Sequence, residues 1–545
     1  MRSGINAVES YKASKGGDGL RIREDLPRLA RQGYEALTLG EKELLKWVGV
    51  FFRRPTPGQF MMRLRMPNGF ATAEQLRAIA EISRRLGNGI LDITTRQQIE
   101  LRGFTLASVE EVWEKLRGVD LHSLQTGQDN VRNINGCPLA GLTPQEALDA
   151  SPVVFELDRQ LVGRDGNPEF TNLPRKFNVT ITGCLENCTH AESQDIALVP
   201  ARLGRRRGFN ILVGGKMGSG GFTIAAPLGV FVEPQEAAGV SAELTRIYRD
   251  HGPRDARAKC RLAFLIEEWG VPRLRAELEY RLKRDFAPAG ADLRRRHHAD
   301  HLGVTPQKQA GLVAVGLCVP TGRLAPDQMA ELAHLADIYG NGQVRLTTGQ
   351  NAILPNVPAH RVKALLAEPL LRQFSPEPSP LARGLVACTG TDFCNLAQIE
   401  TKKLAVEVAA ALEQRLGAKL DPLTIHWSGC PAGCGNHQAA TIGLRGMKVN
   451  IDGRTVEAVA VYVGGRTGPG AVAGRQILDA VPCDEALPDV IAGVIQELGL
   501  VLRDKPEPPL GDSVLKTPAV DVPLSSLVDE NTLPGAEAPR VELAR

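Results

Sequence analysis

Apolar and polar residues alternate along the chain with two characteristic periods, and the segment 66–98 shows both of them. Its apolar side chains first recur three or four positions apart, as on one face of an amphipathic helix: Leu76, Ile79, Ala80, Ile82 and Leu86. A Gly-Asn-Gly stop follows at 87–89, and a short apolar run continues from Ile90 to Thr94. The pattern predicts a turn, a helix of about three turns and a strand.

This helix–strand unit occurs twice. Residues 319–351 align with 66–98 without a gap at an offset of 253, and ten of the 33 positions are identical. Three later pairs of segments also match: TGQD at 126–129 with TGTD at 389–392, GCLENC at 183–188 with GCPAGC at 429–434, and LVGG at 212–215 with YVGG at 462–465. Two long copies do not make a solenoid. We therefore predict an α+β tandem duplication with pseudo-twofold symmetry and a site where the halves meet.

Each copy divides into a smaller and a larger α+β piece. The predicted boundaries are an N-terminal extension at 1–50, a first small domain at 51–125, a first large domain at 126–300, a second small domain at 301–380, a second large domain at 381–504 and a tail at 505–545. The tail contains seven prolines and shows neither a helical nor a strand period. Such a composition predicts disorder or an extended path over the surface.

Composition narrows the function classes. Of the 545 residues, 43% are hydrophobic and 23% charged, and the net charge is only +3, which does not indicate nucleic-acid binding. No apolar run reaches membrane-spanning length, and the first residues lack the apolar core of an export signal. We therefore expect a cytoplasmic protein whose ten cysteines are thiols or metal ligands. Two basic runs, at 202–208 and 293–298, are typical of solvated surface and could also receive an acidic protein partner.

The two copies differ in their cysteines. The second copy has Cys388 and Cys394, then 35 residues, then Cys430 and Cys434. Four thiolates in two pairs could hold a [4Fe–4S] cluster or zinc, or they could be buried structural thiols. The C-x5-C arm is wider than a usual zinc knuckle, and the surrounding glycines let backbone N–H groups reach the sulfurs, which favours a cluster.

The first copy keeps only the pair Cys184 and Cys188, because Gln125 and Val131 stand where the second copy has its other two cysteines. We interpret this pair as a remnant packed in the core rather than as a second cluster. The remaining cysteines are isolated in sequence and are expected to pack as small apolar residues: Cys137, Cys260, Cys318 and Cys483.

The first copy instead has cations at corresponding positions. Arg96 stands where the second copy has Gly349, and Arg132 where it has Asn395. The segment LPRKFNV adds Arg175 and Lys176, with Asn178 on the same strand face as Lys176. Each cation alone is more often a surface charge, but together they predict a pocket for an anionic substrate or cofactor.

These motifs together resemble the sirohaem-containing nitrite and sulfite reductases. The resemblance spans about residues 45–505 and rests on RPTPGQFMMRLRMPNG, DITTRQQIELRG, TGQDNVRNINGCPLAG, LPRKFNV, GFNILVGG and the two cysteine pairs. It implies two ferredoxin-like half-domains that pair about the pseudo-twofold axis, and two larger domains that hold sirohaem and a [4Fe–4S] cluster. Within the family the chain is most similar to the ferredoxin-dependent nitrite reductases.

The resemblance also implies residue roles. Cys388, Cys394, Cys430 and Cys434 would ligate the cluster, and Cys434, one helical turn after Cys430, would also reach the sirohaem iron. The implied distal residues are Arg96, Arg132, Lys176 and Asn178, and the implied contributors to a cradle for the sirohaem carboxylates are Arg63, Arg65 and Arg175.

The substrate follows from the K-x-N pattern at Lys176 and Asn178. Sulfite reductases of the family tend to have a second lysine at that position, so the pattern favours nitrite, and sulfite stays as the alternative. No dinucleotide-binding fingerprint is present, so the electrons are expected to come from a separate protein, which the resemblance implies is a ferredoxin. We expect a monomer. Two rival hypotheses are a cluster-containing oxygenase of corrin biosynthesis and a zinc-stabilised binding module.

Overall fold

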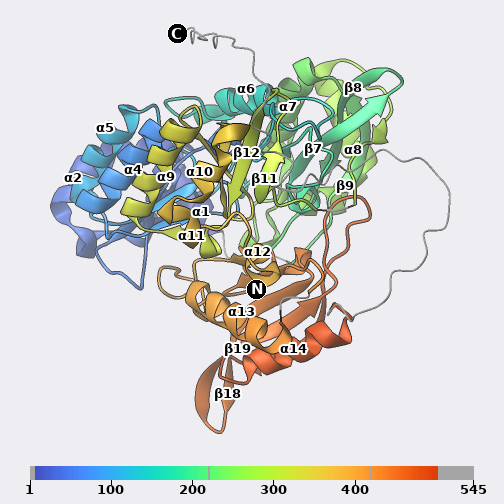
Figure 1. Ribbon diagram of the computed structural model, residues 1–545. Helices are drawn as coiled ribbons and strands as arrows, with labels where there is room; N and C mark the ends of the chain where they lie inside the picture. Colours follow the sequence, from blue (N-terminus) through green and yellow to red (C-terminus); the bar gives the residue numbers. More distant parts are fainter. Residues whose placement is uncertain (1–5, 219–220, 297, 418–419, 501–545) are drawn as a thin grey trace.

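The structure is a computed structural model that describes residues 6–218, 221–296, 298–417 and 420–500. Figure 1 shows three parts: the small domains lie side by side at the left, the first large domain lies to their right, and the second large domain lies below. The predicted proline-rich tail falls outside the described residues. No helix among the described residues is long and apolar enough to cross a membrane.

The two small domains exchange strands. The first sheet has the order β1 (Val50–Phe52), β2 (Phe60–Arg63), β5 (Ile99–Phe104), β4 (Leu91–Ile93) and β13 (Arg323–Leu324). The second sheet has the order β11 (Gly303–Pro306), β12 (Leu312–Leu317), β15 (Ala352–Pro358), β14 (Gln343–Leu346) and β3 (Phe70–Thr72). Each sheet is thus completed by a strand from the other copy.

The predicted helices lie between these sheets and the surface. α4 (Ala73–Arg85) and α9 (Pro326–Tyr339) are the two copies of the repeated helix, and they pack against each other in one shared hydrophobic core (Figure 1). Thr72 caps α4 with a reciprocal side-chain bond to Gln75. The other helices of the small domains are α5 (Val109–Arg117), α10 (Val362–Leu366) and α11 (Pro369–Gln373). The predicted helix–strand unit is confirmed in both copies.

The N-terminal extension packs onto the first half of the chain. Its helices are α1 (Ala7–Ala13), α2 (Leu26–Gln32) and α3 (Leu39–Leu44). The Lys12 ammonium donates to the Leu173 carbonyl at 3.0 Å, and the Trp47 indole donates to the Thr171 carbonyl at 2.8 Å. These buried bonds fasten the N-terminal extension to the first large domain.

The two large domains repeat one architecture. The first contains β6 (Val179–Ile181), β7 (Ile196–Leu203), β8 (Arg206–Val213), β9 (Ala226–Val232), β10 (Ala291–Asp292), α6 (Ser151–Leu161), α7 (Pro234–His251) and α8 (Leu262–Leu282). The second contains β16 (Leu385–Ala387), β17 (Ile425–Ser428), β18 (Ile442–Ile451), β19 (Arg454–Val463), β20 (Arg475–Pro482), α12 (Pro380–Arg383), α13 (Lys402–Leu416) and α14 (Leu487–Glu497). In both domains a parallel strand pair, β6–β7 or β17–β18, is separated by the cysteine loop.

The pseudo-twofold relation extends to single hydrogen bonds, and it crosses between the copies. Thr95 of the first small domain donates to the carbonyl of Cys434 at 3.2 Å. Its counterpart Thr348 donates to the carbonyl of Cys188 at 3.1 Å. Each small domain therefore supports the cysteine loop of the other copy, and the sites form where the halves meet, as the duplication predicts.

Candidate active site

The four cysteines of the second copy converge on one cavity. Cys388 follows β16, Cys394 lies in the turn after it, and Cys430 and Cys434 follow β17. All four line a cavity of about 200 Å³ between the second large domain and the first small domain. The pairs that lie 35 residues apart in sequence therefore form one site.

The spacing of these thiols suits a group larger than a single ion. Among the described residues, no three of the four sulfurs come within 4.8 Å of one another. Tetrahedral zinc needs sulfurs about 3.8 Å apart, given a Zn–S bond of about 2.3 Å. The Gly429 amide donates to the Cys388 sulfur at 3.1 Å, the kind of N–H···S bond that tunes iron–sulfur clusters.

The loop that carries Cys430 and Cys434 is a series of turns, so the expected helical turn between them is wrong. Gly433 adopts a positive φ of 67°, which interrupts any helix there. Gly218 packs on the loop so closely that a Cβ at that position would lie 1.7 Å from the Ala432 carbonyl oxygen. Close packing by backbone, rather than helix formation, fixes this loop.

Buried charges surround the cysteine cavity. In the described part of the chain, two carboxylates, Asp92 and Glu100, lie among a larger set of cations: Arg53, Arg63, Arg102, Arg323 and Lys402. Arg102 pairs with both carboxylates, with Glu100 at 2.5 Å and with Asp92 at 2.6 Å, and Arg63 pairs with Glu100 at 2.7 Å. Burial alone would raise the pKa of Glu100, but these arginines outweigh it and lower that pKa to about 2. The surplus positive charge can offset an anionic cluster.

A second cavity adjoins the first and contains the predicted distal residues. Arg96, Lys176 and Asn178 line it together with Cys434. Thr95, Arg96, Ala432 and Cys434 line both cavities, so the two spaces meet at Cys434. The structure thus brings three of the four predicted distal residues to the cysteine that the resemblance selects as the bridge.

Several polar atoms of this region are buried without a partner among the described residues. They are Nε of Arg96, Nη1 of Arg132 and Oδ1 of Asn178. Such atoms are rare in folded proteins unless a ligand or water satisfies them. Burial, with a contribution from the nearby Arg63, lowers the pKa of Arg96 to about 10. These groups indicate a site for an anion, which would satisfy all the cations at once.

Lys176 is set among other cations. Burial holds its pKa well below the ordinary value, and Arg261 adds to that shift. Arg261 itself forms a fully buried pair with Asp195 at 2.6 Å, and the same carboxylate accepts from the backbone N–H of Asn178 at 2.8 Å. Asp195 therefore fixes the backbone next to Lys176.

The three arginines predicted to form a cradle have different surroundings. Arg63 lines the cysteine cavity and pairs with Glu100. Arg65 lies apart from both cavities, pairs with Asp158 at 3.1 Å and donates to the carbonyl of Arg132 at 3.2 Å. Its guanidinium holds the backbone that presents Arg132. Burial lowers the pKa of Arg175 to about 10, and Arg257 contributes. The roles of Arg63, Arg65 and Arg175 toward a cofactor stay predictions.

Arg445 and Arg53 are further candidates that the sequence did not single out. Arg445 lines a third cavity, of about 340 Å³, which meets the other two at Ala432, and its Nε has no partner in the described structure. The repeat contained a signal, because the first copy has Val199 at the matching strand position. For Arg53, comparison of the two copies gave no such signal.

One expectation about the cysteines is wrong. Cys137 is not isolated, and the pair Cys184 and Cys188 does have further partners. These three thiols and His301 offer ligand atoms that all lie within 4.8 Å of one another. Cys137 lies 47 residues before Cys184 and His301 lies 113 residues after Cys188, so sequence spacing gave no sign of the group.

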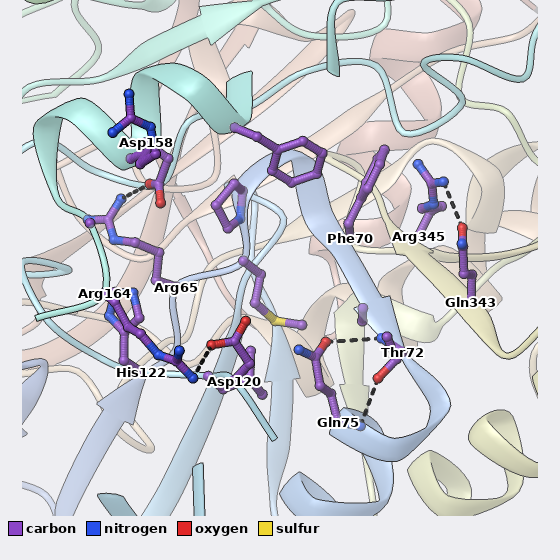
Figure 2. Close-up of a pocket in the computed structure, with 17 residues that line it drawn as sticks. Arg65, Phe70, Thr72, Gln75, Asp120, His122, Asp158, Arg164, Gln343 and Arg345 are labelled. Carbon is purple, nitrogen blue, oxygen red and sulfur yellow. Dashed lines mark hydrogen bonds and ion pairs between the residues drawn. The ribbon is translucent and has the colours of Figure 1, made fainter. Parts of the chain in front are cut away.

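A larger cavity, of about 540 Å³, lies away from all these cysteines (Figure 2). Its charged groups are mostly paired, as Arg65 with Asp158 and Arg164 with Asp120 at 2.9 Å. The Arg345 guanidinium stacks on the Phe70 ring at 3.2 Å. Cavity size alone therefore does not identify the reactive site.

The comparisons with known proteins agree with this geometry. Residues 127–286 match the family model described as nitrite and sulphite reductase 4Fe-4S domain, and residues 52–119 and 305–371 match the nitrite/sulfite reductase ferredoxin-like half domain. The ferredoxin–nitrite reductase of Synechococcus elongatus is 45% identical over 90% of this chain and 96% of its own length. The chain belongs to the nitrite and sulphite reductase family.

Other family members extend the match. The chloroplastic ferredoxin–nitrite reductase of Arabidopsis thaliana is 42% identical over 93% of this chain and 89% of its own length. The solved NirA protein of Mycobacterium tuberculosis is 31% identical, superposes with a TM-score of 0.84, and covers 91% of this chain and 94% of its own. The duplicated α+β fold with two ferredoxin-like half-domains is therefore confirmed.

The residues present fit the family's two cofactors, a [4Fe–4S] cluster and sirohaem. Four thiols with wide sulfur spacing and a cationic surround suit the cluster. Unpartnered arginine nitrogens around Cys434 suit a polycarboxylate macrocycle and an anionic substrate. The chain is an oxidoreductase of this family, as the sequence predicts.

Proposed function

We infer that this protein is an assimilatory, ferredoxin-dependent nitrite reductase that reduces nitrite to ammonium. The observation that carries this inference is the meeting of two cavities at Cys434, one with four thiols and one with Arg96, Lys176 and Asn178. Relatives that align over nine-tenths of the chain are named ferredoxin–nitrite reductase, and that of Haloferax mediterranei is named as assimilatory. Sulfite reduction is the alternative.

In this proposal the cofactors are held by the second copy. Cys388, Cys394, Cys430 and Cys434 would hold the [4Fe–4S] cluster, and Cys434 would also hold the sirohaem iron. When bound, the two groups supply single electrons and a metal that takes up nitrite. The chain's own contribution is to hold the thiolates in place, to exclude bulk water and to surround the site with fixed positive charge.

The cations bind and orient the anion. Nitrite plus six electrons and eight protons gives ammonium and two waters, so negative charge and then protons must arrive in alternation. Arg96 and Arg132 offer guanidinium N–H groups that the chain leaves unused, and they can stabilise the added charge. Asn178 offers an amide that can hydrogen-bond an uncharged or singly charged oxygen.

Lys176 is suited to donate protons. Its pKa is held well below the ordinary value by burial, so its ammonium gives up a proton more readily than a surface lysine. Arg96, whose pKa is about 10, stays charged at neutral pH. In this proposal Arg96 provides a permanent positive charge that binds the anion. Lys176 transfers protons to it and regains them from water.

Charge explains the preference for nitrite. Sulfite is largely a dianion near neutral pH, whereas nitrite is a monoanion, so a site for sulfite gains more from a further cation. This chain has the neutral Asn178 at the cavity wall. We expect Asn178→Lys to shift the ratio of catalytic efficiencies toward sulfite by at least tenfold. An unchanged ratio would contradict the charge argument.

The test uses purified enzyme with a reduced plant-type ferredoxin and each anion in turn. Ammonium should form with far higher kcat/KM than sulfide, and the visible spectrum should show sirohaem, with about five iron atoms per chain. Greater efficiency with sulfite would reverse the assignment. Iron without a haem spectrum would point to the oxygenase, and zinc without iron to the binding module.

A matched pair of variants tests the cluster ligands. Cys434→Ala should lose most iron and the haem spectrum. Cys483→Ala should keep both, because Cys483 packs against the hydrophobic core of the second large domain and does not line the cysteine cavity. Full iron in Cys434→Ala would refute its proposed role. A ferredoxin donor, the monomeric state, a cytoplasmic location and the absence of nucleic-acid and membrane partners belong to the same proposal.

A further inference from the structure

The first copy contains a compact group of metal-ligand side chains that the nitrite reductase reaction does not use. Cys137, Cys184, Cys188 and His301 place three sulfurs and a ring nitrogen within 4.8 Å of one another. All four residues are buried, with exposed fractions of 1%, 0%, 4% and 6% respectively. Within the described structure this is the one such group of cysteines and histidines.

Three separate segments bring these ligands together. Cys184 and Cys188 lie in the loop after β6, Cys137 lies in the segment that leads to α6, and His301 lies between β10 and β11. Backbone bonds hold the third segment against the loop: Arg295 donates to the Leu185 carbonyl at 2.6 Å and Ala299 to the Glu186 carbonyl at 3.0 Å. Backbone hydrogen bonds thus hold two of the three ligand-bearing segments against each other.

The spacing suits one tetrahedral ion. Four ligands at zinc bond lengths of about 2.0 to 2.3 Å stand roughly 3.3 to 3.8 Å apart. The Cys137 sulfur and His301 Nε2 are 3.5 Å apart, within that range. A four-iron cluster lies between its thiolates and keeps them farther apart, as in the wide Cys388–Cys434 cavity. Three thiolates and one imidazole are a usual ligand set for structural zinc.

The carboxylate of Glu186 lies beside the ring nitrogen of His301 that faces away from the sulfurs. Nε2 of His301 faces the sulfurs, and Nδ1 on the other side of the ring lies 3.8 Å from Glu186 Oε2. Metal-bound histidines commonly direct their second nitrogen to a carboxylate, which fixes the tautomer. The Glu186 amide also donates to the Cys184 sulfur at 3.4 Å. One residue therefore supports two of the four ligands.

The surroundings exclude an open coordination position. Cys137, Cys184 and Cys188 form an apolar cluster with Leu139, Ala140 and Leu142 of the same domain and with Ala314 and Ile353 of the second half-domain. Catalytic zinc keeps a site for water or substrate, whereas structural zinc is closed. This group lies where the first large domain meets the second half-domain.

We propose that Cys137, Cys184, Cys188 and His301 bind one structural Zn²⁺. The ion fastens the connector before β11 to the cysteine loop of the first copy. The two copies then use the same loop differently: the second builds the redox centre, and the first builds a zinc clamp with Cys137 and His301 as its additional ligands. This proposal rests on the ligand geometry and not on the proposed function.

The test measures metals in the holoenzyme as isolated. Elemental analysis of wild type should give one zinc per chain beside its full iron content. Cys137→Ser should lose at least four-fifths of the zinc and keep its iron. Cys260→Ser is the matched control, since Cys260 is also buried but its sulfur donates to the Ala256 carbonyl and lies outside the group of metal-ligand side chains; it should keep both metals. Glu186→Gln should weaken zinc retention against a chelator by about 10- to 100-fold.

Zinc-edge X-ray absorption of the wild type covers the case in which Cys137→Ser fails to fold. The expected first shell has three sulfurs at about 2.3 Å and one nitrogen at about 2.0 Å. Absence of zinc from an enzyme with full iron would overturn the proposal while leaving the reductase assignment intact. Loss of iron from Cys137→Ser with Cys434→Ala still holding its iron would overturn both, because the cluster would then belong to the first copy.

Discussion

At the scale of single residues, the reactive site is marked by hydrogen-bonding groups that the chain leaves unsatisfied. Arg96, Arg132 and Asn178 each bury one polar atom without a partner in the described structure. Arg65 and Asp195 nearby are fully engaged and hold the backbone of Arg132 and Asn178. In the proposed function, the first group would bind the ligand and the second would position the first.

Replacing Lys176 by methionine tests the proton-donor role. The variant keeps the length of the side chain and removes its charge, so we expect kcat for nitrite to fall by about 100- to 1000-fold. Lys403→Met, on the exposed face of α13, should be unaffected. The pH profile of kcat decides the role: wild type should lose activity above the lowered pKa of Lys176, and the variant should lack that limb.

His122 makes the free energy of unfolding depend on pH. Burial lowers its pKa to about 3, with contributions from Arg65 and Arg164, which lie near it in Figure 2. Its Nδ1 accepts from the Leu124 backbone amide. The unfolded chain binds a proton near pH 6.5 and the folded chain does not, so this contribution is complete above pH 6.5 and falls on acidification. From pH 7.5 to 5.5 the loss is about 1 kcal/mol.

Urea unfolding of the holoenzyme checks this prediction. The midpoint of wild type should be lower at pH 5.5 than at pH 7.5, and in His122→Asn that difference should shrink, because asparagine does not titrate and can still accept from Leu124. An equal pH dependence in the two proteins would show that His122 does not contribute. Residues with depressed carboxyl pKa values, such as Glu100, titrate below this window.

The repeat allowed much of the site to be predicted at this scale. Comparing the copies identified Arg96, Arg132 and the cysteines Cys388 and Cys394, because a cation or thiol stood where the other copy had a different residue. It could not identify Arg65 as a positioning residue, since its partners Asp158 and the Arg132 carbonyl come together only in the fold. The comparison also missed His301, which lies outside the segments that match between the two copies.

At the scale of elements, two equivalent glycines each pack against the cysteine loop of the opposite copy. Gly218, after β8, meets the Ala432 carbonyl, and Gly468, after β19, meets the Asn187 side chain. Both have positive φ, 72° and 96°, and neither leaves room for a Cβ. The sequence showed matching segments shortly before these glycines, at 212–215 and 462–465, but not that the glycine contacts cross between the copies.

Alanine at each glycine should therefore affect one metal only. Gly218→Ala pushes on the Cys430–Cys434 loop, and we expect it to lower iron content by more than half while zinc stays. Gly468→Ala pushes on the Cys184–Cys188 loop and should lower zinc while iron stays. Elemental analysis of both variants checks the crossing. Loss of the same metal in both would show that the loops are not independently supported.

At the scale of the whole molecule, the two basic runs come together at one corner. Ala291 of β10 pairs with Arg202 of β7, which brings residues 293–296 beside the β7–β8 hairpin. Arg294 is buried against Glu192 and Asp292 and so does not belong to that surface. The exposed members are Arg202, Arg205, Arg206, Arg207, Arg295 and Arg296.

This corner is the candidate docking surface for an acidic ferredoxin. Arg205→Glu with Arg296→Glu should raise KM for ferredoxin by about fivefold or more at low ionic strength, with less effect at 0.5 M salt. Activity with a small-molecule electron donor should not change. Arg372→Glu, exposed at the end of α11, is the control with the same change of sign. An unaltered KM in the double variant would place docking elsewhere.

The exchange of β3 and β13 between the small domains suggests how the duplicated chain evolved. A single copy on its own would leave both its small sheet and its cysteine loop incomplete, and a second identical chain would complete them by the same exchange. The arrangement therefore matches a swapped homodimer whose two subunits became joined in one gene. In such an ancestor every site occurs in two identical versions. Fusion released each version from that constraint, so one loop could specialise in electron transfer and its twin in holding the molecule together.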